Sequence, residues 1–297
     1  GRGRQVKADR RPPARGVLPA GVVALRGGVA EHASDWLADE VPVALVFNGI
    51  SHTVMLVTPA ELEDFALGFA LTEGLIDHPA ELLDVDHQPT PEGIELRLEV
   101  TAACAWRLRE RRRSMAGRTG CGLCGAESLA QVRQPVPALA AVRLSPAAVA
   151  RAQRELRMRQ PMQQLTGAAH AAAWCSPEGK VLLVREDIGR HNALDKLIGA
   201  MVRARIDPRG GFACITSRAS FEMVQKSARA GIAALAAVSA PTALAVELAQ
   251  RCGQLLIGFA RGDDLVAYTF PERLGLLPGD THGDRRNHAE PAPTAGA

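Results

Sequence analysis

The chain of 297 residues has few aromatic residues, no strong excess of charge and no long apolar run. Phe, Trp and Tyr make up 4% of it, so the core must be built from Ala, Val, Leu and Ile. No apolar run is as long as a membrane-spanning helix, which needs about 20 residues. The N-terminus has no export-signal pattern. The net charge of +3 is too small to indicate nucleic-acid binding. We therefore expect a cytoplasmic globular protein with neither membranes nor nucleic acid among its partners.

A second Cys-x-x-Cys motif is also missing, which leaves one closely spaced pair of thiols. Cys121 and Cys124 stand in Gly120–Glu127, with the sequence GCGLCGAE, where a glycine follows each cysteine. Glycine adopts positive φ at little cost, so this segment is predicted to be a mobile loop. Single cysteines in apolar or helical stretches usually behave as small buried hydrophobic residues. We expect this of Cys104, Cys175, Cys214 and Cys252.

Residue types alone leave four interpretations of the thiol pair open. A redox dithiol has this spacing, although such motifs usually sit at a helix N-terminus after a strand. Half of a zinc site would need two further Cys or His ligands from distant positions. A sulfur carrier would hold a sulfane sulfur as a persulfide on one thiolate and move it to an acceptor. A purely structural role is the fourth possibility.

Arginines crowd the segment that leads to the thiol pair. The cluster is either a solvated surface or a basic patch that steers an anionic ligand or an acidic protein toward the thiols. Positive charge there would also lower a thiol pKa and favour the nucleophilic thiolate. The cluster consists of Arg107, Arg109, Arg111, Arg112, Arg113 and Arg118.

The N-terminal half shows strand and helix signals in alternation. Two β-like runs, Val41–Phe47 and Ser51–Val57, flank Asn48-Gly49, which predicts a hairpin. Pro42 predicts that the first strand lies at a sheet edge. Thr58–Glu61, with the sequence TPAE, reads as a capping box that begins a helix.

The C-terminal half alternates between strands and helices from Ala168 to Phe270, after a helix predicted from Ser145-Pro146 to about Met158. This alternation predicts an α/β fold, with helices covering a partly parallel, mixed sheet. The predicted organisation is a disordered tail over 1–18, a smaller N-terminal α+β part over 19–126, the main domain over 127–280 and a disordered tail over 281–297.

Polar residues follow three of the predicted strands, in Asp187–Lys196, Thr216–Ser220 and Gly258–Asp264. Ligands bind at such strand ends in α/β sheets, and helix N-termini there attract phosphate. Taken singly, the segments could be a helix cap, a turn or, for Glu222 and Lys226, an ordinary helix ion pair. Together they predict a nucleotide-like ligand. The candidate ligand-binding residues are Arg190, His191, Asn192, Ser217, Arg218, Ser220, Lys226, Phe259, Ala260, Arg261, Gly262, Asp263 and Asp264.

Four motifs in this order make the chain similar to the FdhD family, the formate dehydrogenase accessory sulfurtransferases. They are CGLCG at Cys121–Gly125, Asp187–Lys196, Ser217–Lys226 and APTALAV at Ala240–Val246. The resemblance covers about residues 41–270. It implies a cytidine deaminase-like α/β/α domain and a homodimer.

The resemblance also implies a function. A cysteine desulfurase would pass sulfur to Cys121 as a persulfide, with Cys124 as the supporting thiol. The protein would deliver this sulfur to the molybdenum cofactor, Mo-bis-molybdopterin guanine dinucleotide, before its insertion into formate dehydrogenase. By similarity Phe259–Asp264 would bind that cofactor, and GDP would mimic it as a ligand. The resemblance implies no metal-binding residues.

Two alternatives remain from the residues. One is a zinc-dependent, deaminase-like hydrolase acting on a nucleotide, and the other is a thiol-disulfide oxidoreductase. The deaminase signature needs His-x-Glu or Cys-x-Glu ahead of Pro-Cys-x-x-Cys. Gly120 stands in place of that proline, and no such element precedes it.

Overall fold

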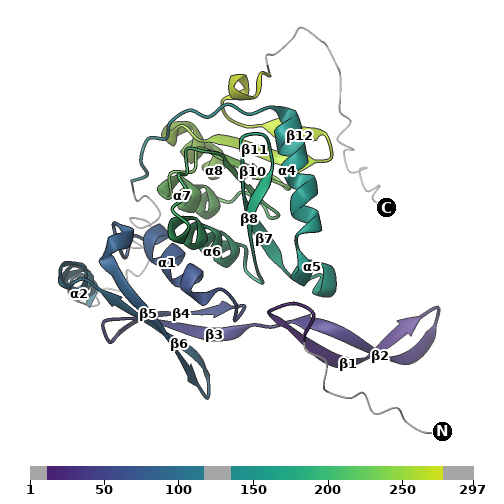
Figure 1. Cartoon of the computed structure of the whole chain (residues 1–297), viewed down its shortest axis with the longest axis horizontal. Helices are drawn as coiled ribbons and strands as arrows, with labels where there is room; N and C mark the ends of the chain where they lie inside the picture. The colour runs from purple at the N-terminus through teal and green to yellow at the C-terminus, as the bar shows by residue number, and fades with distance from the viewer. Residues whose placement is uncertain (1–11, 117–134, 277–297) are drawn as a thin grey trace, which may run out of the picture.

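The computed structural model describes residues 12–116 and 135–276, and Cys121 and Cys124 lie outside these ranges. The described chain forms three sheets, of two, four and six strands, with helices packed against the two larger ones (Figure 1). No helix in these ranges is long and apolar enough to cross a membrane.

The two-stranded sheet is an arm that projects from the body of the molecule (Figure 1). Strands β1 (Val17–Arg26) and β2 (Val29–Ala38) pair antiparallel along their whole length. The expected disordered tail over 1–18 therefore ends too late, because Val17 is buried at the base of the arm. There Val17 packs with Met162 of α5 (Pro161–Thr166). The sequence analysis did not predict this arm.

The four-stranded sheet has the order β4-β3-β6-β5. The predicted hairpin at Asn48-Gly49 is confirmed, and both residues have positive φ, 45° and 79°. The prediction that Pro42 marks an edge strand is wrong, because β3 lies between β4 and β6. Proline is tolerated because the pairing of β3 with β6 begins one residue later, at Val43. The strands are β3 (Val41–Phe47), β4 (Ile50–Val57), β5 (Leu82–Thr90) and β6 (Gly93–Val100).

Helix α1 begins at Leu62, so the predicted capping box at Thr58–Glu61 is wrong. Thr58 is instead tied to the C-terminal half of the chain. Its backbone N–H donates to Oδ2 of Asp187 at 3.0 Å, and its hydroxyl accepts from the N–H of Ile188. The helices of this half are α1 (Leu62–Thr72), the 3₁₀ turn η1 (Pro79–Glu81) and α2 (Ala102–Ala116).

The six-stranded sheet has the order β12-β11-β10-β9-β7-β8. Its middle strands β9, β10 and β11 are parallel, and the other pairings are antiparallel, which confirms the predicted mixed sheet. The strands are β7 (His170–Cys175), β8 (Val181–Asp187), β9 (Phe212–Ile215), β10 (Ala234–Ala237), β11 (Leu255–Arg261) and β12 (Asp264–Ala267).

Helices cover both faces of this sheet, so the predicted α/β/α layering is confirmed. One core joins α6, α7 and α8 to one face, and another joins α4 to the opposite face. The four single cysteines are buried free thiols, as predicted. The helices are α4 (Pro146–Met158), α6 (Arg190–Arg203), α7 (Phe221–Arg229) and α8 (Ala243–Cys252), and η2 (Pro271–Leu274) ends the described chain.

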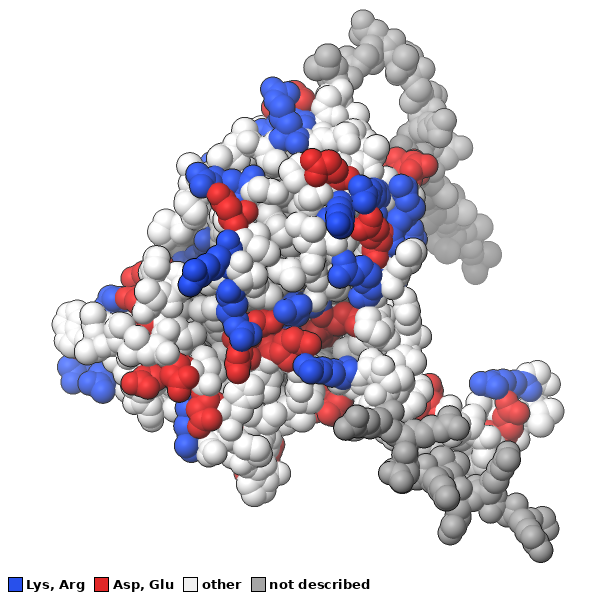
Figure 2. Space-filling view, viewed as in Figure 1, with Lys and Arg blue, Asp and Glu red and all other residues white. Residues whose placement is uncertain are grey.

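Two glycines allow α1 to cross α6 at very short range. A Cβ on Gly68 would lie 1.7 Å from the carbonyl oxygen of Asp195, and one on Gly199 would lie 1.8 Å from that of Asp64. Charged side chains line the same seam, visible as a red and blue band across the middle of Figure 2. Asp64 accepts from both Arg185 and Arg203, at 2.8 Å and 2.7 Å. The N-terminal part is thus held directly on the helical face of the larger sheet.

Candidate functional site: the polar edge of the six-stranded sheet

The loops after β8, β9 and β10 leave the sheet at one edge, and the end of β11 lies beside them. The loop after β9 is bridged to the loop after β10, since Ala219 donates to the carbonyl of Ala240 and Thr242 donates to that of Ala219. The N–H of Phe259 in β11 then donates to the carbonyl of Ser239. The structure therefore brings together the strand ends that the sequence singled out, and we call this surface the polar edge.

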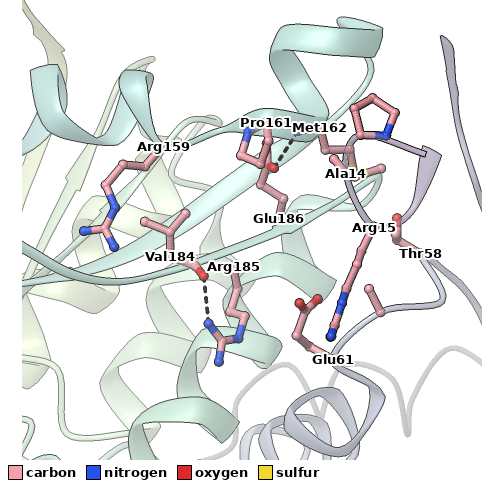
Figure 3. Close-up of a pocket in the computed structure, with 12 residues that line it drawn as sticks. Ala14, Arg15, Thr58, Glu61, Arg159, Pro161, Met162, Val184, Arg185 and Glu186 are labelled. Atoms are coloured by element: carbon pink, nitrogen blue, oxygen red, sulfur yellow. Dashed lines mark hydrogen bonds between the residues drawn. The ribbon is translucent and has the colours of Figure 1, made fainter. Parts of the chain in front are cut away.

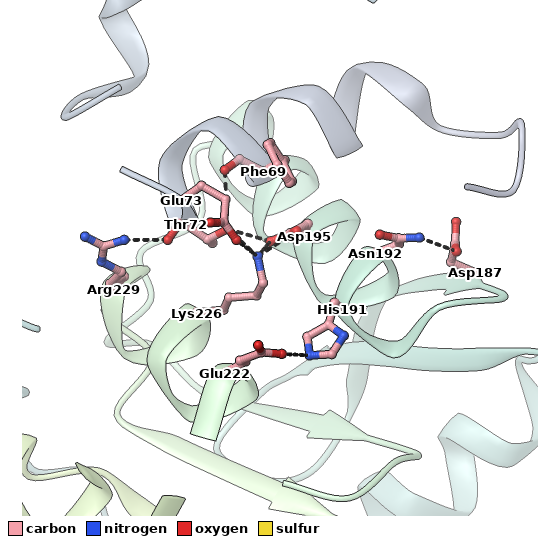
Figure 4. Close-up of polar contacts among 10 residues, drawn as sticks. All are labelled: Phe69, Thr72, Glu73, Asp187, His191, Asn192, Asp195, Glu222, Lys226 and Arg229. Atoms are coloured by element: carbon pink, nitrogen blue, oxygen red, sulfur yellow. Dashed lines mark hydrogen bonds and ion pairs between the residues drawn. The ribbon is translucent and has the colours of Figure 1, made fainter. Parts of the chain in front are cut away.

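Helices α6 and α7 both begin at the polar edge without a side-chain cap on their N-terminal N–H groups. His191, in the first turn of α6, lies with its Nε2 2.5 Å from a carboxylate oxygen of Glu222 in the first turn of α7 (Figure 4). Burial lowers the pKa of His191. The carboxylate of Glu222 acts to raise this pKa, whereas the positive charges of Arg190 and Lys226 lower it further. The pair joins two helix N-termini, where backbone dipoles favour an anion.

Apart from Nε2 of His191, whose contact is the carboxylate of Glu222, two polar atoms at this edge are buried without a hydrogen-bond partner among the described residues. They are Nε of Arg190 and Oγ of Ser220. His170, at the start of β7, lies near enough that Arg190 contributes to lowering its pKa, after burial. Buried polar groups are nearly always hydrogen-bonded, so unpartnered donors beside two uncapped helix N-termini suit an anionic ligand.

The Phe259 segment supplies an aromatic surface beside these groups. Phe259 is 42% exposed and has a φ of 48°, a conformation that is uncommon for a bulky residue. Gly258, the preceding residue, allows Tyr268 to pack closely against β11, because a Cβ on Gly258 would lie 2.7 Å from the ring of Tyr268. Arg261 donates from Nε to the carbonyl of Val238 at 3.0 Å and is otherwise exposed. Backbone strain of this kind is typical of functional sites.

The remaining predicted residues of this segment point elsewhere. Ala260 is buried in the core between the six-stranded sheet and α4. Gly262 forms the turn to β12, with a φ of 59°. Asp263 pairs with Arg154 of α4, on the opposite face of the sheet, and is 93% exposed. Asp264 is exposed in β12.

Two further predicted ligand residues lie in the loop after β9. Arg218 is exposed, and Ser217 donates its hydroxyl to the carbonyl of Arg218.

Asn192 was predicted to bind the ligand, but the structure places it in the protein interior. Its amide donates to the carbonyl of Leu56 at 2.9 Å and to Oδ1 of Asp187 at 3.0 Å. Asp187 is itself fully buried and forms an ion pair with Lys196 at 2.8 Å. These residues fix the start of α6 to β4 and are not presented to a ligand.

Lys226, another predicted ligand residue, is also buried and fully engaged (Figure 4). Its ammonium donates to Thr72 and pairs with Asp195 and Glu73, at 3.0, 3.0 and 2.9 Å. Burial alone would lower its pKa, but the two carboxylates outweigh burial and raise the pKa of Lys226. The alternative of an ion pair between Glu222 and Lys226 is wrong, because Glu222 turns to His191 instead.

A separate cavity of about 290 Å³ lies between β8, α5 and the segment before β1 (Figure 3). Two of the charged side chains that line it, Glu186 and Arg185, are already engaged within the protein. Glu186 accepts from the N–H groups of Met162 and Gln163, and Arg185 pairs with Asp64. None of the predicted ligand residues lines it. The polar edge is therefore the stronger candidate site.

Within the described ranges, no three His, Cys, Asp or Glu side chains gather in a way that could hold a metal ion. Cys121 and Cys124 lie outside those ranges, so the structure places neither thiol. Sequence reasoning missed His170 and the role of Glu222. Neither stands out locally, because each becomes part of the site only through a neighbour on another element.

Comparison with known proteins settles the family. The model of the FdhD/NarQ family matches residues 38–275. This chain belongs to the FdhD/NarQ family. Its relatives include a protein of Variovorax paradoxus named sulfur carrier protein FdhD, 58% identical over 270 residues that span 90% of this chain and 96% of the relative. A protein of the same name from Bordetella petrii is 55% identical, over 87% of this chain and 94% of its own length.

A solved structure has the same fold. It is the crystal structure of a Desulfotalea psychrophila protein described as a formate dehydrogenase accessory protein. It matches with a TM-score of 0.69 and 24% identity, over 87% of this chain and 99% of that one. At this identity the match supports the fold of the FdhD/NarQ chain, and the function has to be argued from its residues and its closer relatives.

Proposed function

We propose that this protein is a sulfur carrier and sulfurtransferase that matures the molybdenum cofactor of formate dehydrogenase. The observation that carries the proposal is the CGLCG segment, with Cys121 and Cys124, in a chain 58% identical to a protein named as a sulfur carrier. On this proposal the protein acts in the cytoplasm as a homodimer, and its donor is a cysteine desulfurase.

The proposed loading step is a thiolate exchange without net redox change. The thiolate of Cys121 attacks the outer sulfur of the persulfide on the donor, the donor S–S bond breaks, and the donor cysteine leaves as a thiolate. Cys121 then holds the sulfane sulfur as a persulfide. When the thiolate of Cys124 attacks the inner sulfur of this persulfide, the S–S bond breaks, the outer sulfur leaves as sulfide for the cofactor, and a Cys121–Cys124 disulfide forms. Cys124 supports the exchange as a neighbouring thiol.

The polar edge is the proposed binding site of the substrate, Mo-bis-molybdopterin guanine dinucleotide. Uncapped N-termini of α6 and α7 suit its phosphates, and Nε of Arg190 and Oγ of Ser220 supply donors that have no partner among the described residues. Phe259 offers a surface for the guanine. We therefore expect GDP to bind more tightly than ADP. Equal affinities in isothermal titration calorimetry would contradict this assignment.

The sulfur-transfer role is tested in cells that lack the endogenous protein. Cys121→Ala is expected to abolish formate dehydrogenase activity, whereas Cys175→Ala, at a buried thiol, should support it. Full activity with Cys121→Ala would refute the proposal. About one zinc ion per chain by elemental analysis would favour the hydrolase instead. A strict requirement for Cys124 without any sulfur loading of Cys121 would favour the oxidoreductase.

A further inference from the structure

Helix α2 carries a surface that the proposed function does not yet use. It contains five arginines and one glutamate and ends at Ala116, five residues before Cys121. Five residues of chain span at most about 18 Å, so the end of α2 stays close to the thiol by covalent connection alone. Figure 2 shows blue side chains at the end of the molecule where Figure 1 places α2.

The inner face of α2 is anchored by a small apolar set. Cys104 and Ala105 are buried in the core of the four-stranded sheet, and Leu108 packs against it. At one end Arg107 is held by Glu81 at 2.6 Å and by Asp77 at 3.2 Å. The helix therefore presents its outer residues from a fixed base.

The outer face combines an exposed aromatic ring with unpaired cations. Trp106 is 63% exposed, although indole rings are usually largely buried. Arg109 follows it by three residues and Arg112 by six, so the three side chains lie along one flank of the helix. Both arginines are exposed and have no ion pair with any described residue, unlike Arg113, which pairs with Glu110 at 2.8 Å.

A cavity of about 240 Å³ opens beside Arg112. Its floor is apolar and comes from α2, from the β3–β4 turn and from the chain after α1. Arg111 and Arg112 form part of its wall. The cavity is smaller than the roughly 300–1,000 Å³ of a typical cofactor site and suits one large side chain. The apolar lining residues are Phe47, Ile50, Leu75, Ala105 and Leu108.

We infer that α2 and this cavity form a docking surface for an acidic protein segment that carries one large apolar side chain. That side chain enters the cavity, and flanking carboxylates pair with Arg109 and Arg112. A buried apolar anchor within a polar rim is the usual anatomy of a protein–protein interface, and Trp and Arg are enriched among the residues that contribute most to binding. The inference rests on the proposed function in one respect: the segment belongs to the protein that donates sulfur to Cys121.

The positive charge gives such a surface a kinetic role. Complementary charge raises the association rate constant more than it slows dissociation, and added salt weakens the effect. Docking at α2 would bring the donor persulfide within reach of the thiol that follows in the chain. The polar edge then remains open for the cofactor, so donor and acceptor would use different surfaces of the protein.

The test is binding of a purified cysteine desulfurase to the full-length double variant Arg109→Glu/Arg112→Glu. Biolayer interferometry is expected to show at least a 10-fold rise in Kd, mainly through a slower and less salt-dependent association. Trp106→Ala should weaken binding in the same direction. The matched control is Arg157→Glu, an equally exposed arginine on α4, which should bind like the wild type. Unchanged binding by the double variant would overturn the inference.

Two further measurements separate this surface from the rest of the account. Inorganic polysulfide should load Cys121 equally in the double variant and the wild type, because it needs no docking. Slower loading of the variant would mean that the environment of the thiol had changed, and this result would contradict the inference. Wild-type protein that binds the desulfurase but takes sulfur from neither source would refute the proposed function alone. If the double variant no longer formed the dimer in sedimentation, α2 would be part of the dimer interface. If it no longer bound GDP, α2 would be part of a nucleotide site. Either result would contradict the inference.

Discussion

The same two sequence motifs build two opposite environments: a buried seam, where β8, α6 and α7 meet the N-terminal part of the chain, and the polar edge. In the seam, Asp187 and Lys196 from one motif and Lys226 from the other are buried and fully paired. At the edge, Arg190 and Ser220 from the same motifs have polar atoms without a partner among the described residues. Residues close together in one motif thus have different roles: the buried, paired ones hold the protein together, and those at the helix N-termini are left for a ligand.

The largest expected effect comes from breaking the seam at Asp187. Asp187→Ala removes the partner of Lys196 and the acceptor for Thr58, Gly189 and Asn192. Loss of one partner of a buried ion pair costs about 3–5 kcal/mol, so the free energy of unfolding should fall by about that amount. Urea unfolding measures it.

The matched control for that change is Asp263→Ala, which removes an exposed carboxylate from its ion pair with Arg154. Exposed pairs contribute little, so its unfolding curve should overlay that of the wild type. If both variants unfolded at the same urea concentration, the distinction between the buried seam and the exposed surface would lose its energetic basis.

The second expected effect concerns the close crossing of α1 and α6. Gly199→Ala would place a Cβ 1.8 Å from the carbonyl oxygen of Asp64, which forces the helices apart and should cost about 1–3 kcal/mol. Thermal unfolding by circular dichroism reports the change. Gly21→Ala, in the exposed arm with nothing within 4 Å, should leave the melting temperature unaltered. Equal melting temperatures for the two variants would rule out the close crossing.

The third effect should appear in ligand affinity and not in stability. Arg190→Gln removes a charged donor at the polar edge, and a hydrogen bond to a charged group contributes about 1.5–3 kcal/mol, so GDP should bind roughly 10- to 100-fold more weakly. Calorimetry with GDP measures this, and Arg157→Gln on α4 serves as the control. A large fall in unfolding free energy with unchanged GDP affinity would assign Arg190 to the seam.

The smallest effect is a dependence of stability on pH. Burial lowers the pKa of His52, His170 and His191, so the unfolded chain binds protons more readily than the folded one as the pH falls below about 6.5. The stability that these neutral side chains preserve above that pH is therefore lost on acidification.

Urea unfolding at pH 7.5 and pH 5.5 tests this sign. The wild type should be less stable at pH 5.5, and His52→Gln, in contact with Phe47 and Phe69, should narrow the difference. Greater stability at pH 5.5 would mean that these imidazoles are charged in the folded protein.

Local patterns predicted most of the larger sheet and its helices, because each buried strand there is short, apolar and followed by a polar turn. They failed where distant contacts decide the outcome. Thr58 has the sequence of a helix cap but is recruited by Asp187, 129 residues away. Pro42 lies in a central strand because the ladder with β6 begins beyond it.

The same limit applied to the site. The three strand ends were found from sequence, since polar residues after apolar strands are a local signal. Which of these residues face a ligand is not a local property: Lys226 looks like a phosphate-binding residue until Asp195 and Glu73 enclose it. His170 carries no signal in its own segment and reaches the edge because β7 pairs it with Asp187 at the end of β8.

The central claim is that Cys121 carries sulfur, and peptide mass spectrometry after incubation with a cysteine desulfurase and cysteine tests it most directly. We predict the mass of one added sulfur atom on the peptide that contains Cys121, lost on treatment with a thiol reductant and absent from Cys121→Ala. An unmodified Cys121 peptide, or the same sulfur gain in Cys121→Ala, would contradict it.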